Sequence, residues 1–170
     1  FNEKIAIKYR AGLSLKYLDS YLENNMVNNS IQQLYYNSKT QQVTANDFET
    51  ILKGNSNKNI DWFFDTVVNT RDLIDYKFSD VNKTKDSITF TLNNKTNTKV
   101  PVPVYGIKSK EIVFKKWLEI SEQDSTFTFS RNGADKIVLN YKGEVPEINA
   151  NNNTFDLNKL FLNRPVKLNL

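Results

Sequence analysis

ITFTL, residues 88–92, and TFTF, residues 126–129, are the stretches that decide the fold. In each, apolar residues alternate with threonine, and this period of two places the apolar side chains on one face of an extended strand. Threonine and phenylalanine also favour strands. Short amphipathic strands with turns and no helical segment between them predict an antiparallel β-sandwich. We expect its interior to contain Phe90, Phe127, Phe129, Ile137 and Leu139.

A glycine turn and two prolines refine this prediction. Asn132-Gly133 lies between TFTF and the apolar stretch 136–141. Both turn residues tolerate positive φ, so the pair predicts a β-hairpin. Pro101 and Pro103 are two residues apart, so their missing N–H groups fall on the same side of one strand. Such a strand pairs on its other side only, which predicts that it lies at the edge of a sheet.

Working back toward the N-terminus, the period becomes helical before about Asp75. Apolar residues recur three or four apart between Tyr9 and Leu22, which predicts a helix that begins near Tyr9. Its expected end is Asn24-Asn25, because asparagine is a poor helix former. We expect Ser30 to cap a second helix.

Two further helices are expected before the strands. Thr44 followed by Asp47 resembles a capping box and predicts the start of a third helix. A fourth is expected over residues 60–68. The sequence thus predicts an α+β fold, with a helical subdomain over residues 1–75 and an immunoglobulin-like antiparallel sandwich over residues 76–170. No Gly/Ser-rich linker joins the two parts, so we expect them to pack firmly together.

Composition excludes several kinds of site. The 170 residues include no cysteine and no histidine, so disulfides, Cys/His zinc sites and His-based catalytic triads are all excluded. A net charge of +4 with both signs interspersed is typical of a solvated surface rather than of a nucleic-acid interface. The apolar runs are too short to predict a membrane span. The many aromatic residues could stack on bases or sugars, but their spacing favours a packed core.

Tyr9-Arg10-Ala11-Gly12, followed by strings at residues 44–48 and 59–64, forms a series of short motifs. Together they resemble the aminopeptidase N-like zinc metallopeptidases, a gluzincin family. Tyr9-Arg10-Ala11-Gly12 corresponds to the family's Tyr-x-Lys-Gly motif, with Ala11 in place of lysine. The strings at residues 44–48 and 59–64 resemble the helix starts that follow it. Later strings resemble a Bacteroidetes-type branch of the family: Pro101 to Gly106, Trp117, Asn140-Tyr141, Val145 to Asn149, Asn151 to Asn153 and Asn163-Arg164-Pro165.

The resemblance implies a function for a longer protein. In the family, zinc and a glutamate general base activate water to attack a peptide bond, and the motif tyrosine donates a hydrogen bond to the developing oxyanion. Tyr9 matches that tyrosine, although its position in the sequence also fits a core aromatic residue. The zinc ligands would come from an upstream catalytic half, so this chain alone would hold no zinc and would not be catalytically competent.

Two functions remain open at this stage. The chain is either the C-terminal part of a metallopeptidase that acts on peptide substrates, or a non-catalytic scaffold or binding module, a pseudo-peptidase favoured by Ala11. In both cases the resemblance implies a cell-envelope location, periplasmic or associated with the outer membrane.

Overall fold

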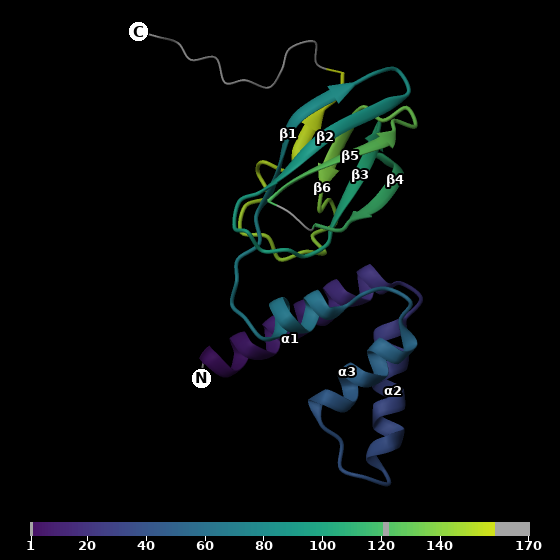
Figure 1. The fold of residues 1–170 in the computed structure, drawn as a ribbon, viewed down its shortest axis with the longest axis vertical. Helices are drawn as coiled ribbons and strands as arrows, with labels where there is room; N and C mark the ends of the chain where they lie inside the picture. The colour runs from purple at the N-terminus through teal and green to yellow at the C-terminus, as the bar shows by residue number, and fades with distance from the viewer. Residues whose placement is uncertain (1, 121–122, 159–170) are drawn as a thin grey trace.

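Helices precede strands along the chain, as the change of period predicts (Figure 1). This computed structural model describes residues 2–120 and 123–158, with side chains from Lys8 onward. The helices are α1 (Asn2–Leu22), α2 (Met26–Ser38), α3 (Ala45–Asn55) and the π-helix η1 (Phe63–Val68). The α+β prediction is confirmed, whereas the division into domains 1–75 and 76–170 stays a prediction. The string Asn163-Arg164-Pro165 lies outside the described residues.

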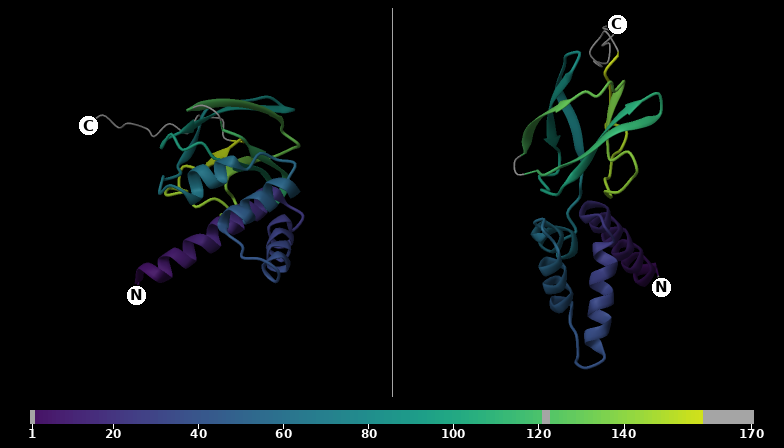
Figure 2. Two further views of the ribbon diagram at one scale, coloured as in Figure 1. Left: turned by 60° about the horizontal axis from the view of Figure 1, so that its bottom comes forward. Right: turned by 90° about the vertical axis from the view of Figure 1, so that its right-hand side faces the viewer.

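Two antiparallel sheets follow the helices, which gather at one end of the sandwich (Figure 2). One sheet has the order β1-β2-β5 and the other β4-β3-β6-β7. Their bounds in chain order are β1 (Tyr76–Lys83), β2 (Ser87–Asn94), β3 (Val102–Lys108), β4 (Glu111–Leu118), β5 (Asp124–Ser130), β6 (Lys136–Leu139) and β7 (Thr154–Asp156).

The alternation in ITFTL separates core from solvent in β2. Its three apolar side chains are buried. Its threonines pair across the outer face with those of β5, Thr89 with Thr128 at 2.9 Å and Thr91 with Thr126 at 3.0 Å between hydroxyl oxygens. The predicted interior residues Phe90, Ile137 and Leu139 are buried, whereas Phe127 and Phe129 pack against the core but are only half-buried. They lie on β5, an edge strand, and so have a neighbouring strand on one side only.

The hairpin predicted at Asn132-Gly133 is wrong, although the turn itself is present. Both residues have positive φ, 48° and 72°. The strands on either side nevertheless belong to different sheets, because β5 pairs with β2 and β6 pairs with β3. After the turn, Asp135 N–H donates to the Ile107 carbonyl at 2.8 Å, which directs the chain onto β3. An Asn-Gly turn usually reverses a strand within one sheet. In this protein it transfers the chain from one sheet to the other.

The edge assignment for the prolines is also wrong, because β3 is a central strand. Pro103 pairs with Trp117 on β4, and its carbonyl accepts from Asn140 N–H at 2.7 Å on the other side. Pairing between β3 and β6 begins only at Val104. The missing donors of Pro101 and Pro103 therefore fall beyond the end of β6, where no ladder bond is lost.

Helix α1 ends close to the predicted position, and α2 begins earlier than predicted. Three successive residues after α1, Glu23 to Asn25, have left-handed φ values of 55–64°, which the two asparagines tolerate well. Helix α2 starts at Met26, so Ser30 is not its cap. Ser30 is buried inside the helix and accepts a hydrogen bond from Asn55 of α3 at 3.3 Å.

The other two helix predictions are confirmed, one of them with an unexpected geometry. Thr44 and Asp47 form a reciprocal capping box at the start of α3. The fourth helix is present, but residues 63–68 adopt the wider π form rather than the α form. None of the described helices has the length and apolar character needed to cross a membrane.

Four aromatic residues join the helices to the sandwich: Tyr17, Tyr21, Trp62 and Trp117, which we call the aromatic joint. The Tyr17 ring lies 4.9 Å from Trp62 and 6.1 Å from Trp117 between centroids. Tyr21 meets both indoles edge-on at 5.4 and 5.3 Å. The Tyr17 hydroxyl donates to the Pro101 carbonyl, and the Tyr21 hydroxyl donates to Glu119 at 3.0 Å. Helices and sandwich therefore share one apolar core.

Candidate functional site

Tyr9 lies on α1 and is 69% exposed. The sequence predicts that this helix begins near Tyr9. It begins at Asn2 instead, so Tyr9 lies within the helix. The core-aromatic interpretation does not hold among the described residues, because the buried face of α1 begins further along, with Ser14, Tyr17 and Leu18. The phenol is instead free to meet a ligand or another part of a protein.

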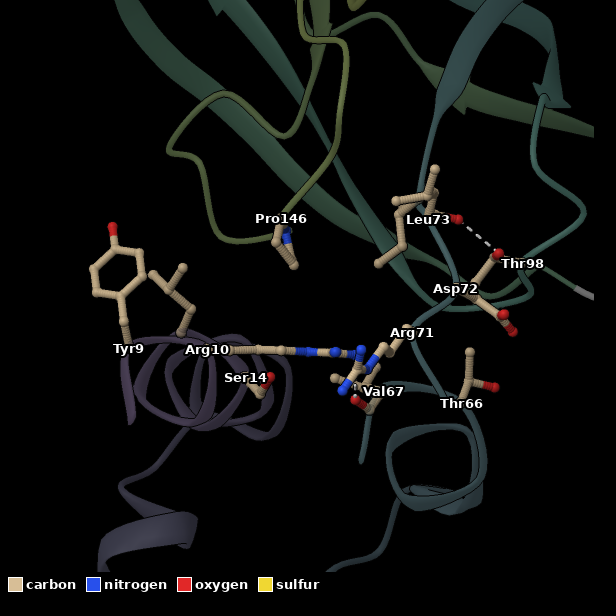
Figure 3. Close-up of a pocket in the computed structure, with 12 residues that line it drawn as sticks. Tyr9, Arg10, Ser14, Thr66, Val67, Arg71, Asp72, Leu73, Thr98 and Pro146 are labelled. Carbon is tan, nitrogen blue, oxygen red and sulfur yellow. Dashed lines mark hydrogen bonds between the residues drawn. The ribbon is translucent and has the colours of Figure 1, made fainter. Parts of the chain in front are cut away.

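A hollow of about 270 Å³ opens beside Tyr9, between α1, the end of η1 and the sandwich. Figure 3 shows the Tyr9 phenol projecting from α1 at one side, with Arg10 crossing the floor toward Val67 and Arg71. We call it the Tyr9 hollow and define it by Tyr9, Arg10, Ser14, Arg71, Thr98 and Pro146. The residues come from four separate parts of the chain, so the hollow exists only in the folded protein.

Arg10 connects α1 to the end of η1. Its Nη2 atom donates to the carbonyls of Thr70 at 2.5 Å and Val67 at 3.4 Å. Carbonyls at the end of a helix lack intrahelical partners and carry partial negative charge, so a guanidinium there is favourable. Arg10 occupies the variable position of the Tyr-x-Lys-Gly motif, where the sequence pattern gave no reason to assign it a role.

A half-buried carboxylate, that of Glu147, holds the segment that carries Pro146. Glu147 accepts from Tyr76 N–H at 3.2 Å and from the amides of Asn140 at 3.0 Å and Asn153 at 2.8 Å. Burial raises the pKa of Glu147, against the effect of these hydrogen bonds. The network ties the 140–153 segment to the start of β1 and so fixes Pro146 at the hollow.

A second, more apolar groove of about 520 Å³ lies between α1, α3 and η1. Arg10 borders both concavities, and the walls of the groove include Leu15, Phe48, Phe64 and Val68. Ala11, which replaces the lysine of the motif, also lines this groove and is exposed. Tyr9 and Ala11 therefore face different concavities.

The residues that the structure describes do not fit a zinc ion. Within residues 8–120 and 123–158, no three Asp or Glu side chains gather in a group that could hold a metal. Histidine and cysteine, the usual zinc ligands, are absent from the sequence. Lys53 pairs with Glu49 and Asp61 at 2.7 Å each, away from the Tyr9 hollow, and lowers the pKa of Asp61.

Comparison with protein-family models and with curated protein sequences finds no match. Among solved structures, the fold is similar to part of Legionella pneumophila aminopeptidase A, determined in complex with aspartic acid. The TM-score is 0.65 at 12% sequence identity, and the match covers 82% of this chain but 17% of that protein. At this identity the similarity establishes the fold of this portion only.

Proposed function

We propose that the chain supplies the C-terminal portion of an aminopeptidase-like metallopeptidase that hydrolyses peptide bonds. The observation that carries the proposal is the position of Tyr9, a phenol on a helix of aminopeptidase-like fold, exposed beside a hollow. The match to only 17% of the aminopeptidase supports a partnership with an upstream catalytic half of the same protein.

In this proposal Tyr9 donates a hydrogen bond to the carbonyl oxygen of the scissile peptide bond. That oxygen gains negative charge as the carbonyl is attacked, so a donor placed there stabilises the transition state more than the bound substrate. A phenol carries its proton at neutral pH and donates without bringing a charge of its own.

This chain would contribute no cofactor ligand. It has no histidine or cysteine, and its described residues form no metal-binding group, so any zinc of the complete protein would be held by residues outside it. The role left to the chain is to place Tyr9 and to support it through the aromatic joint, whose indoles come from Trp62 just before η1 and from Trp117 on β4.

The test is Tyr9→Phe in the full-length protein that contains the upstream half. The change deletes one hydroxyl from an exposed side chain, so the fold should survive. We expect kcat on a peptide substrate to fall by roughly 10²–10³ and KM to change little, the usual effect of losing one oxyanion donor. Tyr35→Phe is the matched control, since Tyr35 is also exposed, at 63%, but lies on α2. Full activity in a folded Tyr9→Phe enzyme would exclude the role.

The exposed Ala11 favours a second candidate function, a non-catalytic scaffold or binding module of the cell envelope. A pseudo-peptidase would keep the fold and the aromatic joint while losing the motif lysine. If the full-length protein with zinc bound shows no peptidase activity, the scaffold takes precedence. The envelope location is a proposal common to both functions, and fractionation of cells with an antibody to this chain would test it.

A further inference from the structure

The Tyr9 hollow contains two guanidinium groups, those of Arg10 and Arg71, that no carboxylate of the described residues neutralises. The ion pairs of the described residues join Lys53 to Glu49 and Asp61, and Lys115 to Glu144. Neither Arg10 nor Arg71 takes part in one. Asp72 also lines the hollow, but Figure 3 shows its carboxylate directed away from both arginines. Positive charge is therefore concentrated on one wall of a concave site.

The two arginines differ in how far they are already fixed. Arg10 is oriented by the carbonyls of Val67 and Thr70, which occupy its Nη2 atom. A guanidinium has five N–H donors, so those on Nε and Nη1 remain for a ligand. Arg71 is exposed and makes no hydrogen bond or ion pair with the described residues. One donor group is thus preorganised, and the other is free to close on a ligand.

We propose that the Tyr9 hollow binds the carboxylate group of a short peptide. Guanidinium groups match the planar carboxylate with paired N–H···O bonds, which makes arginine the usual choice for this ligand. The remaining walls are largely apolar, with Val67 and Ile74 buried and Leu73 and Pro146 at the hollow, so they suit the carbon atoms of a small residue.

The size of the hollow limits the ligand. Its volume of about 270 Å³ is just below the usual range of small-molecule sites, which favours one small residue over a long segment. That the ligand is a peptide rests on the proposed function. The recognition of a carboxylate rests on Arg10 and Arg71 alone.

Binding can be measured on this chain without any activity. We would titrate the protein with N-acetylalanine, which carries a terminal carboxylate, and with N-acetylaspartic acid α-amide, which carries a side-chain carboxylate. N-acetylalaninamide is the uncharged control, and inorganic phosphate tests for a general anion site. Nuclear magnetic resonance would follow the arginine Nε–H signals and the amides of Leu73 and Thr98, which border the hollow.

The expected result is binding of a carboxylate probe, with shifts confined to the hollow and none for the amide control. The carboxylate probe that binds more tightly shows whether the site prefers a terminal or a side-chain carboxylate. Arg71→Gln should weaken binding about tenfold or more, the effect of one lost charge-assisted hydrogen bond. Lys116→Gln removes an equal charge from exposed surface of β4 and should leave binding unchanged.

Three results would overturn the inference: tighter binding of phosphate than of either carboxylate, equal binding of N-acetylalaninamide, or unchanged affinity in Arg71→Gln. Arg71 has no partner among the described residues, so its replacement should not impair folding. Because this assay needs neither Tyr9 nor turnover, its failure is separate from failure of the Tyr9→Phe test.

Discussion

Replacing Tyr17 by phenylalanine tests how firmly the aromatic joint holds the helices to the sandwich. Tyr17 is fully buried, and its hydroxyl donates to the carbonyl of Pro101, which is buried as well. The substitution keeps the ring and its contacts with Trp62 and Trp117 but removes the donor. A buried carbonyl deprived of its donor costs about 1–3 kcal/mol of the free energy of unfolding. For a chain of this size, that loss lowers Tm by about 2–12 °C.

Tyr21→Phe is the matched control, one helical turn further along α1. Tyr21 is 1% exposed and touches the same two indoles, but its hydroxyl donates to Glu119, an exposed residue of the chain. Water can solvate the Glu119 carboxylate after the phenol is lost, so the cost should stay near the net value of a hydrogen bond, about 0.5–1.5 kcal/mol. The two variants therefore differ mainly in whether water can reach the acceptor that has lost its donor.

Urea unfolding followed by tryptophan fluorescence is the appropriate measurement, because both tryptophans belong to the joint. We expect the midpoint to fall in both variants, more in Tyr17→Phe, with the slope unchanged. Equal losses, or a larger loss in Tyr21→Phe, would refute the argument that burial of the acceptor sets the cost. A changed slope in Tyr17→Phe alone would mean that helices and sandwich no longer unfold together.

Further predictions concern the sheet, a helix cap and pH. In Gly106→Ala the new Cβ would lie 2.1–2.7 Å from the Phe114 ring, so we expect a loss of about 1–3 kcal/mol that largely disappears in a Phe114→Ala background; equal losses in both backgrounds would rule out the clash. Thr44→Ala removes the N-cap of α3 and should lower the free energy of unfolding in urea by about 1 kcal/mol. Thr40→Ala, in the turn between α2 and α3, should cost less. Hydrogen bonds from Thr44 lower the pKa of Asp47. Its carboxylate therefore stabilises the fold at pH values above the ordinary aspartate pKa of about 4, and this contribution is lost as the pH falls through the lowered pKa. The difference in stability between the wild type and Asp47→Asn should therefore shrink in acid, and a difference independent of pH would contradict the capping role.

Local patterns predicted elements better than they predicted pairing. The alternation in ITFTL identified a strand and its buried face, and Thr44 with Asp47 identified a helix start, because both signals depend on neighbours in sequence. The partner of a strand depends on distant residues. Asn132-Gly133 has the backbone of a hairpin turn, yet the chain passes to β3 because Ile107 offers a carbonyl there. Pro103 is tolerated in the central strand β3, and Pro101 just before it, because β6 ends first, and the sequence of β3 alone does not contain that information.

In the candidate site, too, a local motif could be predicted from the sequence, whereas the tertiary arrangement could not. Tyr9 could be selected from a motif, but its exposure could not, because an aromatic residue at helical spacing fits a core equally well. Arg71, Thr98 and Pro146 meet Arg10 only through tertiary structure, from positions 61, 88 and 136 residues further along the chain. Nothing in the local sequence around any of them distinguishes it from an ordinary surface residue.

Helix α1 carries both Tyr9 and the two tyrosines of the aromatic joint, Tyr17 and Tyr21, so a tilt of the helix at the joint would move Tyr9. Eight residues separate Tyr9 from Tyr17, a length of about 12 Å along the helix axis. A tilt of about 5° at the joint would displace Tyr9 by about 1 Å, and a misplacement of that size can reduce turnover by about 10²-fold. In the proposed peptidase, a substitution at Trp117, on a strand of the sandwich, would then lower turnover by displacing Tyr9, in addition to any loss of stability.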